Sequence, residues 1–224
     1  MLLDSHTIST VPPSVIYIPN FINADEEKEI IDKVYSAPKP KWTQLKNRRL
    51  QNWGGIPHPK GMIPEKIPDW LQKYVDKVTA LQVFDEGSSP NHVLVNEYLA
   101  GQGIMPHLDG PLFFPVVTTI SCGSHTILNF FPYSGTASDA DLSTAKKVYS
   151  LLLEPRSLLV LKNEMYKNYM HGIEEIKSDE INDQINNLDA CCEKYSIKED
   201  VSRSTRISLT IRNVPKCSNF KLRF

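Results

Sequence analysis

The 224-residue sequence lacks the features that assign a chain to a membrane, secreted or repetitive class. It has no stretch near the roughly 18 apolar residues that a membrane span needs. Its first ten residues carry Asp4 instead of the basic and apolar stretches of a secretory signal, and we find no internal repeat. We therefore expect a soluble monomer of the cytoplasm and nucleus, with no membrane partner.

Cysteine and net charge are also scarce. The four cysteines form no CxxC pair, which argues against a zinc knuckle or a disulfide scaffold. With 25 basic and 26 acidic residues, the formal charge is −1, so the chain as a whole does not select a polyanionic partner. Recognition of a charged partner must therefore come from a local segment.

Helical patterns come first in the chain, and strand patterns follow. Asn23 with Glu26 three residues later forms a helix-capping pattern, and Trp70, Tyr74 and Val78 recur at helical spacing. From residue 92 onward the apolar period changes to two, which predicts strands at 92–99, 116–122, 126–131, 150–153, 157–161 and 206–214. Helices followed by many short strands predict an α+β fold that is mostly β.

Two of the predicted strands have a polar face. In the strand at 206–214, apolar residues alternate with the polar set Arg206, Ser208, Thr210 and Arg212. The strand at 92–99 places Asn96 and Tyr98 together on one face. Such faces are typical of surface strands in water, but two of them can also line a polar cavity inside a small barrel whose outside is covered by helices.

A candidate metal site is formed by two histidines and an aspartate. His107 and Asp109 are two residues apart, so an extended backbone points both side chains the same way. His171 can supply a third ligand and complete the facial triad of non-haem Fe(II) oxygenases, which leaves three positions of the ion open. Arg206 and Arg212 follow, suited to bind a dicarboxylate through charge-assisted hydrogen bonds.

These motifs resemble those of the Fe(II)- and 2-oxoglutarate-dependent dioxygenases of the AlkB group. The motifs that carry the resemblance are Asn96-x-Tyr98, His107-x-Asp109, His171 and Arg206-x-Ser208-x-Thr210-x-Arg212. The segments GIMPHLDGP and SLLLEPRSLLVLK look very like the subfamily called AlkB homologue six, and the similarity extends from about residue 11 to 215. The resemblance implies a double-stranded β-helix, or jelly roll, with N-terminal helices packed on its outside.

The resemblance also implies a role for each motif. His107, Asp109 and His171 would bind Fe(II), and 2-oxoglutarate and molecular oxygen would be the cosubstrates for oxidation of a C–H bond. The residues implied in binding 2-oxoglutarate are Asn96, Tyr98, Arg206, Ser208, Thr210 and Arg212. Ser208 replaces the asparagine of the founding bacterial enzyme, and a serine hydroxyl can still donate or accept a hydrogen bond.

We expect residues 1–224 to form one dioxygenase domain. Residues 1–90 would be an N-terminal extension that holds the helices and a nucleotide-recognition lid, and residues 91–215 would be the jelly-roll core. An insert near 174–204 carries nine acidic residues and three lysines within 174–200, which predicts a mostly solvated surface segment.

A basic segment lies at residues 39–60. It holds six lysines and arginines, no acidic residue and two interleaved tryptophans, and the resemblance places the lid here. Basic groups with aromatic planes are typical of nucleic-acid binding, and the predicted substrate-binding residues are Lys46, Arg48, Arg49, Trp53 and Lys60. The alternative is a solvated basic loop whose tryptophans, Trp42 above all, are anchored in the core.

Three functions are consistent with these patterns. The favoured one is oxidative demethylation of an alkylated base in DNA or RNA. The second is hydroxylation of a protein or small molecule at the same iron site, because this fold hosts many substrates. The third is a nucleic-acid-binding module with weak catalysis, against which the complete triad and the arginine pair argue.

Overall fold

The computed structural model describes residues 3–133, 135 and 146–218. The strands are β1 (Val15–Ile18), β2 (Thr43–Gln44), β3 (Arg49–Trp53), β4 (His92–Tyr98), β5 (Ile104–His107), β6 (Val116–Cys122), β7 (Thr126–Pro132), β8 (Tyr149–Leu153), β9 (Leu158–Lys162), β10 (Tyr169–Ile173), β11 (Ser178–Glu180), β12 (Asp200–Ser202) and β13 (Arg206–Arg212). The α-helices are α1 (Ala24–Tyr35), α2 (Asp69–Thr79) and α4 (Asn163–Lys167), with 3-10 helices at Asp4–His6, Lys39–Lys41 and Leu188–Ala190.

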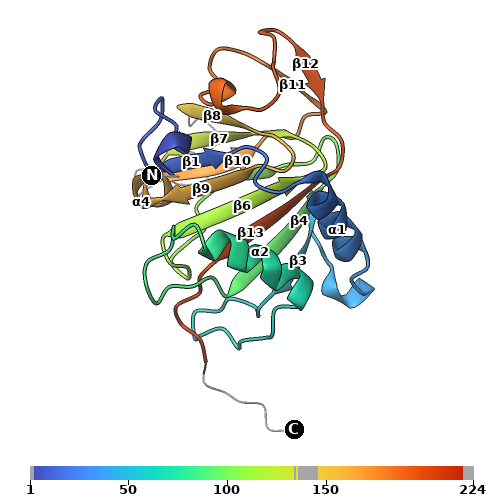
Figure 1. Ribbon diagram of the computed structural model, residues 1–224, viewed down its shortest axis with the longest axis vertical. Coiled ribbons are helices and arrows are strands. Elements are labelled where there is room, and N and C mark those ends of the chain that lie inside the picture. The colour runs from blue at the N-terminus through green and yellow to red at the C-terminus, as the bar shows by residue number, and fades with distance from the viewer. Residues whose placement is uncertain (1–2, 134, 136–145, 219–224) are drawn as a thin grey trace.

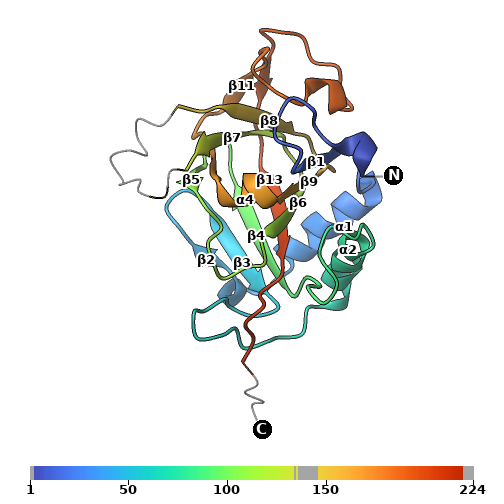
Figure 2. The ribbon, with the colours of Figure 1, turned by 90° about the vertical axis from the view of Figure 1, so that its left-hand side faces the viewer.

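The strands assemble into two main sheets and one small ribbon (Figures 1 and 2). The larger sheet has the order β1-β9-β6-β13-β4-β3-β2, and the smaller one has the order β5-β10-β7-β8. The ribbon pairs β11 with β12. Apolar residues of both sheets, among them Leu128 and Phe130 of β7 and Leu159 and Leu161 of β9, form a common core between them. This arrangement confirms the predicted α+β, mostly β fold.

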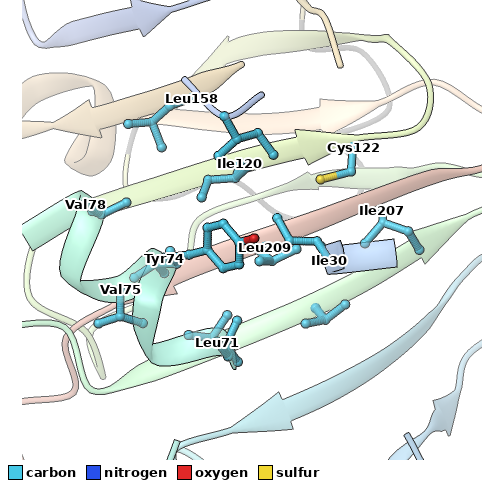
Figure 3. Packing of buried hydrophobic residues seen from close by; sticks show 14 of the residues in the cluster. Ile30, Leu71, Tyr74, Val75, Val78, Ile120, Cys122, Leu158, Ile207 and Leu209 are labelled. Atoms are coloured by element: carbon cyan, nitrogen blue, oxygen red, sulfur yellow. The ribbon is translucent and has the colours of Figure 1, made fainter. Parts of the chain in front are cut away.

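The two N-terminal helices cover the outer face of the larger sheet (Figures 1 and 3). Helix α1 begins with the predicted capping box, in which the Asn23 side chain accepts from the Glu26 N–H at 2.8 Å and the Glu26 side chain accepts from the Asn23 N–H at 3.0 Å. Helix α2 buries Leu71, Tyr74 and Val78 against the sheet. Apolar residues at helical spacing therefore place both helices outside the sheets, as predicted.

The acidic insert is more firmly docked than its composition predicts. Its Ile181 and Ile185 are buried against Ile127 and Leu152 on the outer face of the smaller sheet. Buried Asp179 of β11 pairs with the Arg203 guanidinium, with Nε–Oδ2 and Nη2–Oδ1 distances of 2.6 and 2.7 Å. Two buried isoleucines and one buried ion pair hold a segment whose other residues are mostly exposed, and the structure departs from the predicted, mostly solvated surface at these buried positions.

Strand β13 brings the two predicted polar faces together. It lies between β6 and β4, and its antiparallel register with β4 pairs Arg206 with Tyr98 and Ser208 with Asn96. Because directly paired residues point to the same face of a sheet, these side chains share one surface. That surface faces the smaller sheet and not water. Among the described residues, no helix is long and apolar enough to cross a bilayer.

Candidate iron and cosubstrate site

A cavity of about 240 Å³ lies between the two sheets. One part of its wall is polar and is formed by Asn96, Tyr98, Arg206, Ser208, Thr210 and Arg212 of the larger sheet together with His107, Asp109 and His171. The rest is mainly aliphatic and includes Ile104, Leu128, Leu159 and Leu161. The structure therefore brings together all nine residues that the sequence motifs assign to metal and cosubstrate.

The histidines and the aspartate converge because of strand pairing. His107 ends β5 and is paired directly with His171 of β10, so both imidazoles project from the same face of the smaller sheet. Their ring centroids are 4.5 Å apart. Asp109 follows two residues after His107, and one ligand atom from each of the three residues lies within 4.8 Å of the other two.

The donor atoms of this cluster fit a divalent cation. His107 Nδ1 is 2.9 Å from the Met105 carbonyl, to which it donates, so Nε2 keeps its lone pair. Asp109 Oδ1 accepts from Arg212, whereas Oδ2 is buried with no hydrogen-bond partner in the described structure. Burial lowers the pKa of His171 to about 4; the Asp109 carboxylate opposes this shift, and His107 and Arg212 add to it more weakly. A neutral imidazole pair with one carboxylate is the ligand set of Fe(II) oxygenases.

Arg206 is a buried cation without a carboxylate partner in the described part of the chain. Its side chain is 4% exposed, and Nη2 donates to Ser121 Oγ at 2.8 Å while Nε has no partner. Its guanidinium carbon lies 5.8 Å from the centre of the Tyr98 ring. Burial lowers the pKa of Arg206 to about 10, so the group stays charged at neutral pH. A charge buried in this way favours an anionic ligand such as a carboxylate.

Arg212 is held by a different set of contacts. Its Nη1 donates to Asp109 Oδ1 at 3.0 Å, and its guanidinium lies 3.8 Å from the centre of the Phe113 ring. Burial lowers the pKa of Arg212, and the nearby Asp109 carboxylate opposes that shift. Arg212 therefore fixes the orientation of Asp109 and leaves Oδ2 of that carboxylate without a hydrogen-bond partner among the described residues.

Sequence patterns missed two residues that support this site. Ser121 lies on the apolar strand β6 and pairs with Ser208, so its contact with Arg206 exists only once β6 and β13 are aligned. Tyr166 of α4 donates to the carbonyl of Gly110 at 3.0 Å and so holds the turn that follows Asp109. Neither residue belongs to a motif, and only a polar residue inside an apolar run pointed to Ser121.

The basic segment divides between the two faces of the larger sheet. Arg48 lines the cavity, and its Nε donates to Asn96 Oδ1 at 3.2 Å. Arg49 lies on the opposite face, where it forms an ion pair with Glu97 and lies 4.1 Å from the Trp42 ring centre. Arg48 immediately precedes β3, and neighbouring residues of an extended backbone point to opposite faces, which separates the two arginines.

The other predicted substrate residues lie away from the cavity. Trp53 is half-buried on the helix side, 6.1 Å from Trp70 between ring centres, and its Nε1 donates to Gln51 Oε1 at 3.0 Å. Lys46 and Lys60 are exposed. Of the five residues predicted to bind substrate, the structure places Arg48 in the cavity wall and holds Arg49 and Trp53 in contacts with the scaffold.

Comparisons with known proteins point to one family. The model of the 2OG-Fe(II) oxygenase superfamily matches residues 41–212. A zebrafish (Danio rerio) protein named "Probable RNA/DNA demethylase ALKBH6" is 50% identical over 216 residues, which cover 96% of this chain and 91% of that protein. An uncharacterized protein of Acanthamoeba polyphaga mimivirus is 30% identical over 89% of this chain and 84% of its own length.

Solved structures with low sequence identity share the fold. The structure of OsALKBH1 superimposes with a TM-score of 0.59 at 17% identity, over 91% of this chain and 98% of that one. A Pseudomonas putida prolyl-4-hydroxylase gives a TM-score of 0.53 at 12% identity, over 97% and 100% of the two chains. These likenesses concern the arrangement of the sheets.

Proposed function

This chain belongs to the 2OG-Fe(II) oxygenase superfamily and uses Fe(II) and 2-oxoglutarate, and from that premise we propose that it demethylates an alkylated base of a nucleic acid by oxidation. Hydroxylation of an N-methyl carbon gives an N-hydroxymethyl group, which leaves as formaldehyde and restores the N–H. The observation that carries the proposal is the 50% identity to a zebrafish protein named as a probable RNA/DNA demethylase. The cationic Arg48 in the cavity wall supports it.

The residues of the cavity have distinct parts in this reaction. We assign the iron to His107 Nε2, Asp109 Oδ2 and His171, because these donors converge and are otherwise unused. With 2-oxoglutarate and oxygen, bound iron supplies an oxidant strong enough to hydroxylate a C–H bond. Arg206, held by Ser121, binds one carboxylate of the cosubstrate.

The remaining residues orient and enclose the reactants. Arg212 holds the Asp109 carboxylate in place, and Asn96, Tyr98, Ser208 and Thr210 offer hydrogen bonds along the same wall. The aliphatic wall formed by residues such as Leu128 and Leu159 keeps water from the reacting atoms. We place the whole chemical step within the cavity between the sheets.

Loss of metal binding tests the assignment of the ligands. The variant Asp109→Ala removes the single anionic ligand, so we expect a Mn(II) affinity at least a hundredfold weaker than that of the wild type, measured by calorimetric titration. A Ser208→Ala variant, which keeps all three ligands, is the matched control and should retain the affinity. Unchanged Mn(II) stoichiometry in a folded Asp109→Ala, His171→Ala double variant would reject the assignment.

The substrate class is tested with the Fe(II)-loaded protein. Methylated oligonucleotides and methylated peptides are incubated separately with 2-oxoglutarate, and succinate, formaldehyde and the mass of each substrate are measured. We expect loss of 14 mass units from an oligonucleotide with matching formaldehyde release. Modification of a peptide alone would replace this proposal with a protein hydroxylase or demethylase.

A further inference from the structure

We infer that the cavity selects methylated bases that are neutral and carry a carbonyl where N3-methylcytosine and N1-methyladenine carry an amino group beside the methylated nitrogen, and that Arg48 determines this selection. The inference rests on the proposed demethylation of nucleic acid and names the substrate class within it. It concerns the choice among bases and leaves the assignment of iron and cosubstrate as it stands. Charge balance, the contacts of Arg48 and the anchoring of its strand support it.

Positive charge is in excess inside the cavity. Its lining includes Arg48, Arg206 and Arg212 but a single acidic residue, Asp109. Fe(II) and the 2-oxoglutarate dianion carry equal and opposite formal charges, so their binding leaves this excess of two positive charges in place. Charges interact more strongly between the low-dielectric walls of a cavity than in water.

Among the described residues that line the cavity, no carboxylate remains available for a cationic base. Asp109 Oδ1 already accepts from Arg212, and Oδ2 is the atom assigned to the metal. The nearest other acidic residue on these strands, Glu97, lies on the opposite face of the sheet and pairs with Arg49. A methylated base that carries a positive charge would therefore meet cations without a compensating anion.

Arg48 has donors left for a substrate. Its side-chain hydrogen bond in the described structure uses Nε and Asn96 Oδ1, and no carboxylate of the described residues lies within ion-pair distance of its guanidinium. The two terminal NH₂ groups are donors only, so they bond to a carbonyl oxygen and are repelled by an amino group. Arg48 thus distinguishes a carbonyl oxygen from an amino group at the ring position next to the methylated nitrogen.

The scaffold fixes the direction in which Arg48 points. Arg49 pairs with buried Glu97, and the Tyr35 hydroxyl donates to the same carboxylate at 2.7 Å. Residues 49–53 of β3 pair with β4 in one continuous register. With Arg49 held on the helix side of the sheet, its neighbour Arg48 is held on the cavity side.

The chemistry of methylated bases makes this selection measurable. N3-methylcytosine and N1-methyladenine are cations at neutral pH and have an amino group beside the methylated nitrogen. N3-methyluracil, N3-methylthymine and N1-methylguanine are neutral and have a carbonyl there. N3-methyluracil and N3-methylcytosine form the sharpest pair, because they share ring size and methyl position and differ in charge and in the group at position 4.

Binding to the Mn(II)- and 2-oxoglutarate-loaded protein tests the inference without turnover. Two single-stranded RNAs identical except for one N3-methyluridine or one N3-methylcytidine are titrated by fluorescence anisotropy, and the experiment is repeated with the DNA equivalents. We expect the N3-methyluridine strand to bind about tenfold more tightly, a difference of ~1.4 kcal/mol. In Arg48→Gln, which lacks the charge, the ratio should fall to about one.

Lys46→Gln is the matched control, because Lys46 is an exposed cation of the same hairpin outside the cavity. It should weaken both strands equally and keep the tenfold ratio. With Fe(II) in place of Mn(II), formaldehyde release from the two strands should follow the order of the affinities in the wild type.

The outcomes separate this inference from the proposed function. Preference for the N3-methylcytidine strand, or a ratio that Arg48→Gln leaves unchanged, overturns selection by charge while demethylation of nucleic acid stands. Failure of every methylated strand to bind or to release formaldehyde, in a protein that oxidises a methylated peptide, overturns both.

Discussion

The buried arginines of this protein have different roles, which depend on whether a carboxylate lies beside the guanidinium. Arg203 and Arg212 have carboxylate partners, whereas Arg206 is equally buried and, among the described residues, its side chain hydrogen-bonds to the Ser121 hydroxyl and to no carboxylate. Removing a cation from water costs several kcal/mol unless an anion compensates. The unpaired member of this set is therefore the one expected to bind a ligand, and the paired members hold structure.

The substitution Arg206→Lys should weaken 2-oxoglutarate binding. An ammonium group cannot reproduce the planar, two-point contact of a guanidinium with a carboxylate, so we expect a loss of about 1–3 kcal/mol in binding free energy, measured by calorimetric titration of the Mn(II)-loaded protein. Arg156→Lys, at a partly exposed pair with Glu27, is the control and should bind 2-oxoglutarate normally. Equal affinity in both variants would remove Arg206 from the cosubstrate site.

Trp53 should contribute to folding stability more than to binding of nucleic acid. Its ring packs edge-on against Trp70 and lies under the Lys41 ammonium at 4.3 Å, on the side of the sheet away from the cavity. We expect Trp53→Ala to lower the free energy of unfolding by about 3 kcal/mol, measured with urea. The folded variant should keep an oligonucleotide affinity within twofold of the wild type. A Trp53→Ala protein with the unfolding free energy of the wild type but a weaker oligonucleotide affinity would show that the ring stacks on bases.

At the scale of elements, the β2–β3 hairpin places the residue proposed to bind substrate on one face of the sheet and the residues that anchor the hairpin on the other. It forms the edge of the larger sheet next to β4, and at its tip the Asn47 side chain hydrogen-bonds to Glu175, at the start of the acidic insert. Side chains alternate between the two faces of the sheet from Arg48, just before β3, through the strand itself. Arg49 and Trp53 face the helices, while Arg48 faces the cavity.

The two neighbouring arginines should therefore give opposite results on substitution. Arg49→Gln leaves Glu97 buried without its cation, and we expect a loss of about 2 kcal/mol in folding stability, below the ~3–5 kcal/mol of a fully buried pair because Arg49 reaches solvent. The slope of log affinity against log salt should stay unchanged, because the ion pair with Glu97 already occupies the Arg49 guanidinium. Anisotropy titrations at several salt concentrations measure it. A slope flatter by ~0.7–0.9 would mean that Arg49 does contact a phosphate.

The insert should respond to acid through Asp179. Burial raises the pKa of this carboxyl, but Arg203 and His125 together lower it by more than burial raises it. The pKa of Asp179 therefore lies below its ordinary value. A depressed pKa in the folded state means that the pair stabilises the protein above the unfolded pKa, near 4, and that this stability is lost as pH falls through the folded pKa. Acid should therefore loosen the insert.

Asp179→Asn tests this contribution. We expect a loss of about 3–5 kcal/mol in unfolding free energy at pH 7, because Arg203 is left buried without an anion. Below pH 4 the stability of the variant should fall less steeply than that of the wild type. Asp183→Asn, at an exposed position of the same insert, should match the wild type at every pH in urea titrations. Equal curves for the two variants would contradict the role of the buried pair.

At the scale of the whole molecule, local patterns were enough to predict the fold class, whereas the gathering of nine residues at one site was implied by the family resemblance and not by the patterns alone. Strand β13 has the strict period of two that the sequence shows, and β4 and β6 lie where strands were predicted. The side of the sheet reached by Arg48 or Arg49 was not predictable, because it depends on the pairing of Arg49 with Glu97, 48 residues away. One domain over residues 1–224 stays a prediction.

Docking of the insert also depends on contacts between residues that are far apart in the sequence. Glu154, at the end of β8, is 3% exposed and accepts from the Tyr17 hydroxyl at 3.0 Å. It also accepts from the backbone N–H groups of Cys192 and Glu193, both at 2.9 Å. Backbone N–H groups that donate to a buried carboxylate leave no signature in the composition. The sequence therefore did not predict that this acidic segment is docked.

The central place of β13 has a consequence for biosynthesis. This strand is translated after every other strand of the described chain, yet it lies between β6 and β4. Until residues 206–212 leave the ribosome, β4 with its hairpin and β6 with β9 and β1 have no shared neighbour, and each presents an open edge. Open edges beside unfilled apolar surface invite association with other chains. The open edges of β4 and β6 therefore stay exposed to other chains until residues 206–212 have been made.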